Sequence, residues 1–340
     1  MEKNYSKISE FILKRVKHHS SDLVPFVAKQ FGFSRQRAHA YVVKEVRLGR
    51  ILKVGRTRAT RYFLVGGKHI EFALEIKPGL EEDRIWSEYI KPMVSNYPDN
   101  ISAICSYGFT EILNNAIDHS DGTSIYIEVT ISQGELEMTI MDNGVGIFQK
   151  IQNALHLESI KESLFHLSKG KFTTDPKNHT GQGIFFTSRI FNKFSILSSD
   201  LQYTFKGEEW FLSHEKGENF GQGTSIQMVV SLNSKITPKQ IMDKYANVDI
   251  GFTKTIVAVA LSADPNDPHV SRSQAKRLVM GLEKFKTVVL DFKGVKSVGQ
   301  AFVDQIFRVF QNEHPEIIIR YVNTNSEVES MIKRGLNAQP

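Results

Sequence analysis

The residues best suited to chemistry lie in the middle of this 340-residue chain, and the first of them are Glu111 and Asn115. They are four residues apart in SYGFTEILNNAIDHS, which we expect to be helical, so both lie on one face of the helix. A carboxylate there can orient or deprotonate an attacking water or hydroxyl group. An amide oxygen one turn away can bind Mg²⁺, which prefers hard oxygen donors. Taken alone, this pair is better explained by a solvated helix face.

Three glycine-containing segments follow in the order DNGVG, TGQG and GQGT. In the first, an Asp at the end of an expected strand can accept a hydrogen bond from an adenine amino group, and its glycines let the backbone approach the ring. The second opens an expected helix whose N-terminal amides can hold phosphate. The third leads into a strand and would close the adenine side. Each segment is a weak signal, but their order makes them jointly strong. The candidate nucleotide-binding residues are Asp142, Gly144, Gly146, Thr180, Gly181, Gln182, Gly183 and Thr224.

The positive charge of the chain is concentrated at its N-terminal end. The net charge is +6, yet residues 1–67 hold 15 Lys and Arg against 4 Asp and Glu, and the remainder holds 28 against 33. A basic module on an acidic body indicates that one end binds a polyanion. DNA is favoured over the alternative, a protein-docking module with solvated basic residues. The candidate DNA-binding residues are Arg35, Gln36, Arg37 and His39 at the start of a helix, and Arg56, Arg58 and Arg61 in a basic turn after it.

The elements that would position these basic residues form a winged helix-turn-helix layout. Ile8, Phe11, Ile12 and Val16 have the spacing of one helical face. Ser21-Asp22 can cap a second helix that stops at Gly32, and Ser34 can cap a third that ends at Gly49. ILKVGRTRATRYFLV then reads as two strands around a basic turn.

The rest of the chain predicts two further modules. A helix followed by the strands SIYIEVTIS and ELEMTIMD suggests an α+β sandwich. Asn233 to Asp249 reads as a linker. Strands and helices alternate after it, which predicts a small α/β sheet that is parallel in part. We therefore expect a multi-domain α+β chain with domains at residues 1–67, 80–234 and 251–336.

The motifs of the middle domain resemble those of the GHKL ATPases, the superfamily of gyrase, heat-shock chaperones, histidine kinases and MutL. EILNNAIDHS resembles the N box, and DNGVG, HTGQGI and FGQGTSIQMVV resemble the three glycine boxes. The stretch KFTTDPKNHTGQGI is similar to the end of the ATP lid in many sensor kinases. The resemblance implies a Bergerat-type α/β sandwich that binds ATP and Mg²⁺. It further implies that Glu111 is the general base, Asn115 the Mg²⁺ ligand and Asp142 the adenine anchor. Gly144 and Gly146 would line the base, Gly181 and Gly183 would hold phosphate, and Lys171 in the lid would approach the γ-phosphate.

Two departures narrow this resemblance. The second glycine box, GQGIFF, lacks the third glycine that is often present, and no histidine lies between His69 and His119. Histidine kinases need a phosphoacceptor histidine on a preceding helical hairpin, so a conventional histidine kinase is not expected. NNAIDHS resembles the N box of anti-sigma-factor serine kinases most, and the gyrase version nearly as much. The segment TVVLDFKGVKSVGQAFVDQIFRVF resembles a STAS-like domain. In the anti-sigma-factor antagonists of this class, a serine at the start of the helix after this strand accepts phosphate. The resemblance places Gln300 and Ala301 at that position, which favours a docking or sensing domain over a kinase substrate in cis.

Together these features predict a nucleotide-responsive DNA-binding regulator. The alternatives are a protein serine/threonine kinase of the anti-sigma-factor type that acts on a separate partner, and a gyrase- or MutL-like clamp that dimerises on ATP. Cys105 is the only cysteine, which excludes an intrachain disulfide. No apolar run approaches the ~20 residues of a membrane span and no signal peptide is evident, so we expect a cytoplasmic protein without membrane contact. Homodimerisation stays open.

Overall fold

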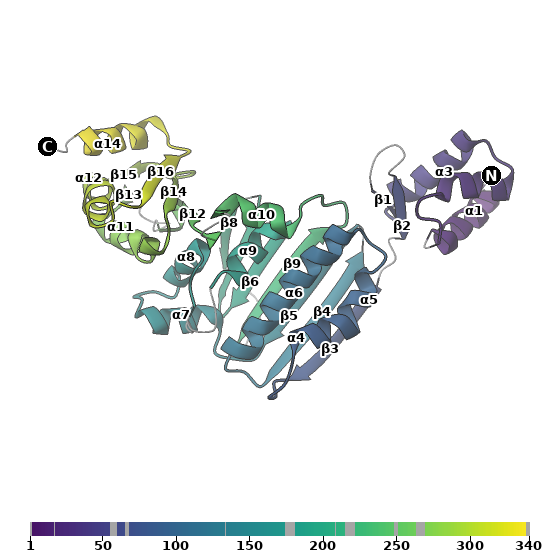
Figure 1. The fold of residues 1–340 in the computed structure, drawn as a ribbon, viewed down its shortest axis with the longest axis horizontal. Helices are drawn as coiled ribbons and strands as arrows, with labels where there is room; N and C mark the ends of the chain where they lie inside the picture. The colour runs from purple at the N-terminus through teal and green to yellow at the C-terminus, as the bar shows by residue number, and fades with distance from the viewer. Residues whose placement is uncertain are drawn as a thin grey trace. The chain divides into compact units, whose positions relative to one another are not determined.

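The computed structural model describes residues 2–16, 18–54, 60–64, 68–132, 134–173, 181–207, 209–214, 222–247, 251–262 and 269–337. Its elements are drawn in Figure 1. The chain divides into two compact units. The first comprises residues 1–143, 190–194 and 225–237, and the second comprises residues 144–189, 195–224 and 238–340.

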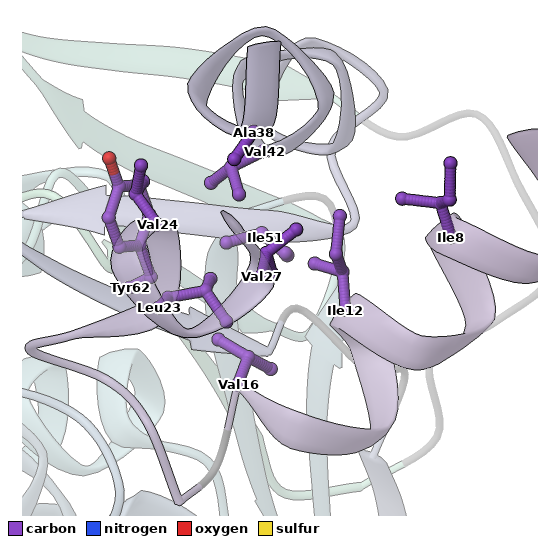
Figure 2. Packing of buried hydrophobic residues seen from close by; sticks show 10 residues of the cluster. All are labelled: Ile8, Ile12, Val16, Leu23, Val24, Val27, Ala38, Val42, Ile51 and Tyr62. Carbon is purple, nitrogen blue, oxygen red and sulfur yellow. The ribbon is translucent and has the colours of Figure 1, made fainter. Parts of the chain in front are cut away.

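The first unit begins with three helices and a strand pair: α1 (Glu2–Arg15), α2 (Leu23–Phe31), α3 (Arg35–Arg47), β1 (Ile51–Val54) and β2 (Arg61–Leu64). The expected apolar face of the first helix is confirmed. Ile8, Ile12 and Val16 are buried, and Figure 2 shows them among the core residues of this module. β1 and β2 are antiparallel, with Ile51 opposite Leu64. The core therefore joins all five elements of the predicted layout.

Local capping explains where these helices begin and end. The Oγ of Ser34 accepts a hydrogen bond from the backbone N–H of Arg37 at 3.2 Å, which satisfies one free donor at the start of α3. Gly32 ends α2 in the left-handed conformation at a φ of 62°. Asp22 occupies the expected N-cap of α2, but its carboxylate makes no capping hydrogen bond and instead contacts His19.

The remainder of the first unit is a sheet with helices on one face. Its strands are hydrogen-bonded in the order β3-β4-β5-β9, and in Figure 1 the helices α4, α5 and α6 lie over β3, β4 and β5. The bounds are β3 (Lys68–Glu75), α4 (Glu82–Ile85), the π-helical η2 (Trp86–Ile90), α5 (Lys91–Val94), α6 (Asp99–His119), β4 (Ser124–Ser132), β5 (Glu135–Asp142) and β9 (Thr224–Ser231). Alternate residues of β4 are buried, as an antiparallel strand with one covered face requires.

Two elements differ from the sequence-based expectation. β3 lies before residue 80, where the ATPase-like domain was expected to begin, and it pairs along its whole length with β4. The segment expected to be a linker contains a helix, α10 (Pro238–Tyr245). Only part of the stretch from Asn233 to Asp249 is therefore an irregular connection.

The second unit contains the helices and strands that surround the glycine segments. They are α7 (Ile147–Leu155), α8 (Glu162–Lys169), α9 (Gly183–Ile190), β6 (Lys193–Ser198), β7 (Leu201–Lys206) and β8 (Glu209–His214). The strands follow the order β6-β7-β8. A short hairpin of β10 (Ala246–Asn247) and β11 (Gly251–Phe252) leads into the last module.

That module confirms the predicted α/β alternation. β12, β14 and β16 form a parallel sheet in this order, with Thr255 opposite Val288 and Val288 opposite Ile319. Its bounds are β12 (Lys254–Ala258), η3 (Val259–Ser262), β13 (His269–Val270), α11 (Arg272–Val279), η4 (Leu282–Lys284), β14 (Thr287–Asp291), β15 (Ser297–Val298), α12 (Gln300–Asp304), η5 (Gln305–Phe310), α13 (Gln311–Glu313), β16 (Ile318–Val322) and α14 (Ser326–Asn337). Gln300 stands at the start of α12, as the resemblance to STAS-like domains implied.

Across the described ranges, no helix combines the length and apolar character that crossing a bilayer requires.

Candidate functional site

Glu111 and Asn115 lie one turn apart on α6, on a face that is half-buried. α6 packs into the unit so closely that a Cβ added at Gly108, one turn before Glu111, would lie 2.3 Å from the Phe191 ring. This contact fixes the rotation of the helix and therefore the side on which the carboxylate and the amide lie. α6 also packs against β5, the strand that ends at Asp142. The neighbouring Tyr107 has its pKa raised, first by burial and then by the charge of Glu111.

The end of β5 is held by Asn143, which the sequence analysis did not single out. Its Oδ1 accepts hydrogen bonds from the backbone N–H groups of Thr123 at 2.8 Å and Ser124 at 3.0 Å. Its Nδ2 donates to the Thr123 hydroxyl at 3.0 Å. Asp142 precedes it and stands opposite Ile125 in the β4–β5 pair. Asn143 therefore fixes the backbone from which the Asp142 carboxylate projects.

In the second unit, the first and third glycine segments meet at the start of α7. The Thr224 hydroxyl accepts a hydrogen bond from the Ile147 backbone N–H at 2.9 Å, and so satisfies a free donor of the helix. Gly146 has a φ of 94°, and a Cβ there would lie 2.6 Å from the Ser198 Oγ. The Ser198 hydroxyl in turn donates to the Gly223 carbonyl at 2.9 Å. Gly144 and Gly146 are both buried. A side chain at residue 146 is therefore disfavoured twice, by the positive φ of the backbone and by the clash of its Cβ with Ser198.

The second glycine segment forms the N-terminus of α9. Gly181 has a φ of 66°, and a Cβ there would lie 2.3 Å from the Phe172 carbonyl oxygen. Gln182 precedes the helix, its carbonyl accepts from the Phe186 N–H, and Gly183 is the first helical residue. Helix N-terminal amides and left-handed glycines are the features from which phosphate cradles are built. Thr180, predicted beside them, lies outside the described residues.

Lys171, expected to approach the γ-phosphate, has a different partner in this structure. Its Nζ donates to the Lys284 carbonyl at 2.7 Å and lies 4.8 Å from the centre of the Phe285 ring. Burial lowers the pKa of Lys171, and the charge of Lys284 lowers it further. The ammonium group is therefore held by the C-terminal module.

The candidate DNA-binding residues that the structure describes are all exposed. Arg35, Gln36, Arg37 and His39 lie in the first turns of α3, and Arg61 begins β2. The guanidinium of Arg37 lies 4.3 Å from the centre of the Phe33 ring, which restricts its direction. Arg56 and Arg58 lie outside the described residues.

A magnesium ion would find few protein ligands here. Within the described part of the chain, no group of three His, Cys, Asp or Glu side chains could hold a metal ion. Mg²⁺ bound with nucleotide commonly takes one or two protein oxygens and completes its shell with phosphate oxygens and waters. An Asn115 amide oxygen on a half-exposed helix face fits that sparse donor set.

Comparison with known families identifies two of the modules. Residues 106–234 match the family described as histidine kinase-, DNA gyrase B- and HSP90-like ATPase, and residues 274–329 match the STAS-like domain of unknown function DUF4325. None of the curated proteins matches the chain. The protein therefore contains an ATPase domain of the GHKL type, followed by a STAS-like domain. All candidate nucleotide-binding residues fall inside the first match.

Proposed function

We propose that this protein is a nucleotide-responsive DNA-binding regulator whose ATPase domain binds Mg²⁺-ATP. The observation that carries the nucleotide part is the GHKL ATPase match, which contains the acidic, amide and glycine motifs in the expected order. Gly146 and Gly181 support it, since both have positive φ and lack room for a side chain. Such positions persist where the backbone itself must approach a neighbour or a ligand.

Each candidate residue has a role that its chemistry allows. Asp142 would accept a hydrogen bond from the adenine amino group, and the buried glycines 144 and 146 would line the ring. Gly181, Gln182 and Gly183 would present backbone amides to phosphate. Asn115 would bind Mg²⁺, and Glu111 would act as the general base toward water or a hydroxyl group.

The DNA part rests on the N-terminal module. Three helices followed by an antiparallel strand pair support the proposal of a winged helix, in which Ser34 caps the helix that would enter the major groove. The excess of 15 basic over 4 acidic residues in positions 1–67 suits a phosphate backbone. Exposed Arg35, Gln36 and Arg37 have side chains that can make bidentate contacts with base edges. The STAS-like domain would take a protein partner.

Calorimetric titration of the full-length protein with ATP and Mg²⁺ tests the nucleotide part. Asp142→Asn should raise the ATP dissociation constant about 10- to 100-fold, because a hydrogen bond to a charged acceptor contributes about 1.5–3 kcal/mol. Asp200→Asn, in an exposed turn between β6 and β7, is the matched control and should bind like the parent. Unchanged affinity in Asp142→Asn would remove the adenine-anchor assignment.

The same titration, repeated with a random-sequence DNA duplex, tests the regulatory part. ATP and ADP should alter DNA affinity to different extents, since a ligand shifts an equilibrium only by its differential affinity for the two states. Equal DNA affinity with ATP, ADP and no nucleotide would show domains that are merely tethered. Stable transfer of phosphate to a separate protein would favour the serine/threonine kinase alternative.

A further inference from the structure

The stretch between the first and second glycine segments is packed against the C-terminal module. We call residues 158–171 the α8 segment, and the described residues from 251 to 337 the C-terminal domain. Both belong to the second unit, where α8 packs against β12 and η3. Every residue from Ser163 to Lys169 is buried, although three of them are serine or lysine. A helix that is covered on all sides and still carries polar residues needs specific partners for them.

Lys169 finds its partners at the end of a helix of the C-terminal domain. Its Nζ donates to the carbonyls of Met280 at 2.9 Å and Arg277 at 3.2 Å. Arg277 lies in the last turn of α11, and Met280 is the C-cap. The last carbonyls of a helix lack partners within it and form the negative end of its dipole. Lys169, which is 2% exposed, therefore caps α11 from another part of the chain.

Lys171 repeats this arrangement two residues later. Its Nζ donates to the carbonyl of Lys284, the last residue of η4, and the Lys284 Nζ returns a bond to the Lys171 carbonyl at 3.3 Å. The intervening Gly170 has a φ of 81°, and a Cβ there would lie 2.9 Å from the Phe252 ring. Between the two lysines, the backbone at Gly170 therefore packs directly against the C-terminal domain and leaves no room for a side chain.

Contacts in the opposite direction complete the interface. The Thr255 hydroxyl of β12 donates to the Lys169 carbonyl at 2.7 Å in a buried position. Arg277 pairs with Glu162 at 3.2 Å and with Glu158 at 3.3 Å. The pairs of Arg277 are partly exposed and contribute little, whereas the buried hydrogen bonds are expensive to leave unmade.

The α8 segment also leads directly to the glycine segment of α9. Phe172 follows Lys171, and its backbone is in close contact with Gly181. The Phe185 ring of α9 packs at a tilt of 45° against the Phe252 ring, with centres 4.6 Å apart, and the Phe252 and Phe285 rings pack edge to face at 5.3 Å. The C-terminal domain therefore contacts both the two lysines and α9, the helix whose N-terminal amides are the candidates for phosphate binding.

We propose that the C-terminal domain is an internal competitor of the nucleotide: its backbone carbonyls hold Lys169 and Lys171, and ATP phosphate draws the same lysines away from them. This inference rests on the proposed ATP binding. An ammonium group bonds more strongly to an ionised phosphate oxygen than to a neutral carbonyl. ATP binding and docking of the C-terminal domain are then negatively coupled, and by linkage each weakens the other equally. A protein that binds the STAS-like domain would act through the same coupling.

Full-length Thr255→Val and Arg277→Gln test this proposal, because both substitutions lie in the C-terminal domain and leave Lys169 and Lys171 intact. Without nucleotide, amide exchange in the α8 segment of Thr255→Val should be about tenfold faster than in the parent, because the Lys169 carbonyl loses its buried donor. Exchange in α6 and β4 should stay unchanged. Thr287→Val, on the adjacent strand of the same sheet, is the matched control and should exchange like the parent. Arg277→Gln removes only the partly exposed pairs with Glu158 and Glu162, so it should speed exchange in the same segment to a smaller extent, and it is the second variant if Thr255→Val fails to fold.

Calorimetry on the same proteins supplies the second readout. ATP should bind Thr255→Val about fivefold or more tightly than the parent, and Arg277→Gln more tightly by a smaller factor. Saturating ATP should speed exchange in the α8 segment of the parent. If the variants exchange faster but bind ATP with the same affinity as the parent, this inference is overturned while the proposed ATP binding stands. Absence of ATP binding in the parent overturns the proposed function, and this inference with it. Unchanged amide exchange in both variants would show that these contacts do not hold the α8 segment, and this would overturn the inference.

Discussion

Glu111 and Asn115 share one face of α6, and substitutions there should separate turnover from binding. Glu111→Ala should lower ATP hydrolysis or phosphotransfer by about 10²- to 10⁴-fold, the usual contribution of a general base, while ATP stays bound. Asn115→Ala should instead remove the Mg²⁺-dependent part of the affinity. Phosphate release and calorimetry on both variants make the comparison. Hydrolysis at the parental rate by Glu111→Ala would contradict the catalytic assignment.

His166 should make the second unit sensitive to acid. It is 5% exposed within α8, and its Nε2 has no hydrogen-bond partner among the described residues. Burial, and then the charges of Lys169 and Lys284, lower its pKa from 6.5 to about 3. Between these values the unfolded chain binds a proton that the folded chain does not, so stability falls as pH drops below 6.5. At pH 5 the loss should be about 2 kcal/mol.

Urea unfolding at pH 7.5 and pH 5 measures this loss. His166→Gln replaces the imidazole with a polar group that does not titrate, so its stability should change less between the two pH values. His39 is exposed on α3, and His39→Gln is the matched control that should retain the full parental pH dependence. An equal pH dependence in parent and His166→Gln would show that other groups govern acid sensitivity.

At the level of elements, the α9 N-terminus depends on a glycine that two constraints fix. Gly181→Ala must adopt a positive φ and place its Cβ against the Phe172 carbonyl. Gly207→Ala, in the β7–β8 turn, has a φ of 60° but open space around its Cβ. We expect Gly207→Ala to cost about 1–2 kcal/mol for the left-handed backbone. Gly181→Ala should cost a further ~1–3 kcal/mol for overpacking and should weaken ATP binding, whereas Gly207→Ala should not.

Urea unfolding and ATP titration of this pair provide the check. Equal losses of stability in the two variants would mean that the Phe172 contact relaxes without cost. Retention of full ATP affinity by Gly181→Ala would argue against a phosphate-binding role for this segment.

The elements that could be predicted from the sequence are those whose residues carry their own pattern. The helical spacing of Ile8, Ile12 and Val16, the Ser34 cap and the alternation in β4 each follow from local chemistry. Glu111 and Asp142 were singled out because their motifs occur in the order that is typical of the GHKL ATPases, and their roles remain predictions. β3 was missed although Ile70, Phe72 and Leu74 alternate with more exposed residues as in a strand, because it lies between Gly66-Gly67 and the polar stretch near Pro78, which were read as the boundary between two domains.

Residues that position the candidate site were missed for a different reason, which is that their partners lie far away in the sequence. Asn143 follows a recognised motif residue, but its three hydrogen bonds reach back to residues 123 and 124. Thr224 is a candidate for the adenine side, and the role of its hydroxyl in capping α7 was not foreseen. Lys169 caps a helix more than a hundred residues later in the chain. No local pattern contains these partners, since tertiary packing alone brings them together.

At the scale of the whole molecule, the charge division predicts salt-dependent DNA binding through the N-terminal module. The affinity of the full-length protein for a DNA duplex should fall steeply with salt, by a log–log slope of about −0.9 for each phosphate contact. Arg61→Ala should reduce the magnitude of that slope, because its exposed guanidinium would neutralise a phosphate. Arg37→Ala should mainly relax sequence preference, as expected of a side chain at base edges.

Lys333→Ala, in the C-terminal domain, is the control for a general change in charge and should leave the slope unaltered. Fluorescence anisotropy across a salt series measures all three variants. Binding that does not respond to salt, or no binding, would favour a protein-docking role for the three helices.

The capping of α11 by Lys169 also bears on how such a chain can be inherited and divided. The ATPase match ends at residue 234, which suggests that recombination or truncation after α10 would leave an ATPase domain that folds by itself. Such a cut would remove the carbonyls that Lys169 and Lys171 bind and the Phe252 ring that covers Phe185. The α8 segment and the C-terminal domain are therefore expected to change together in evolution. A STAS-like domain taken from an unrelated protein would fit here only if it offered helix ends at the same two places.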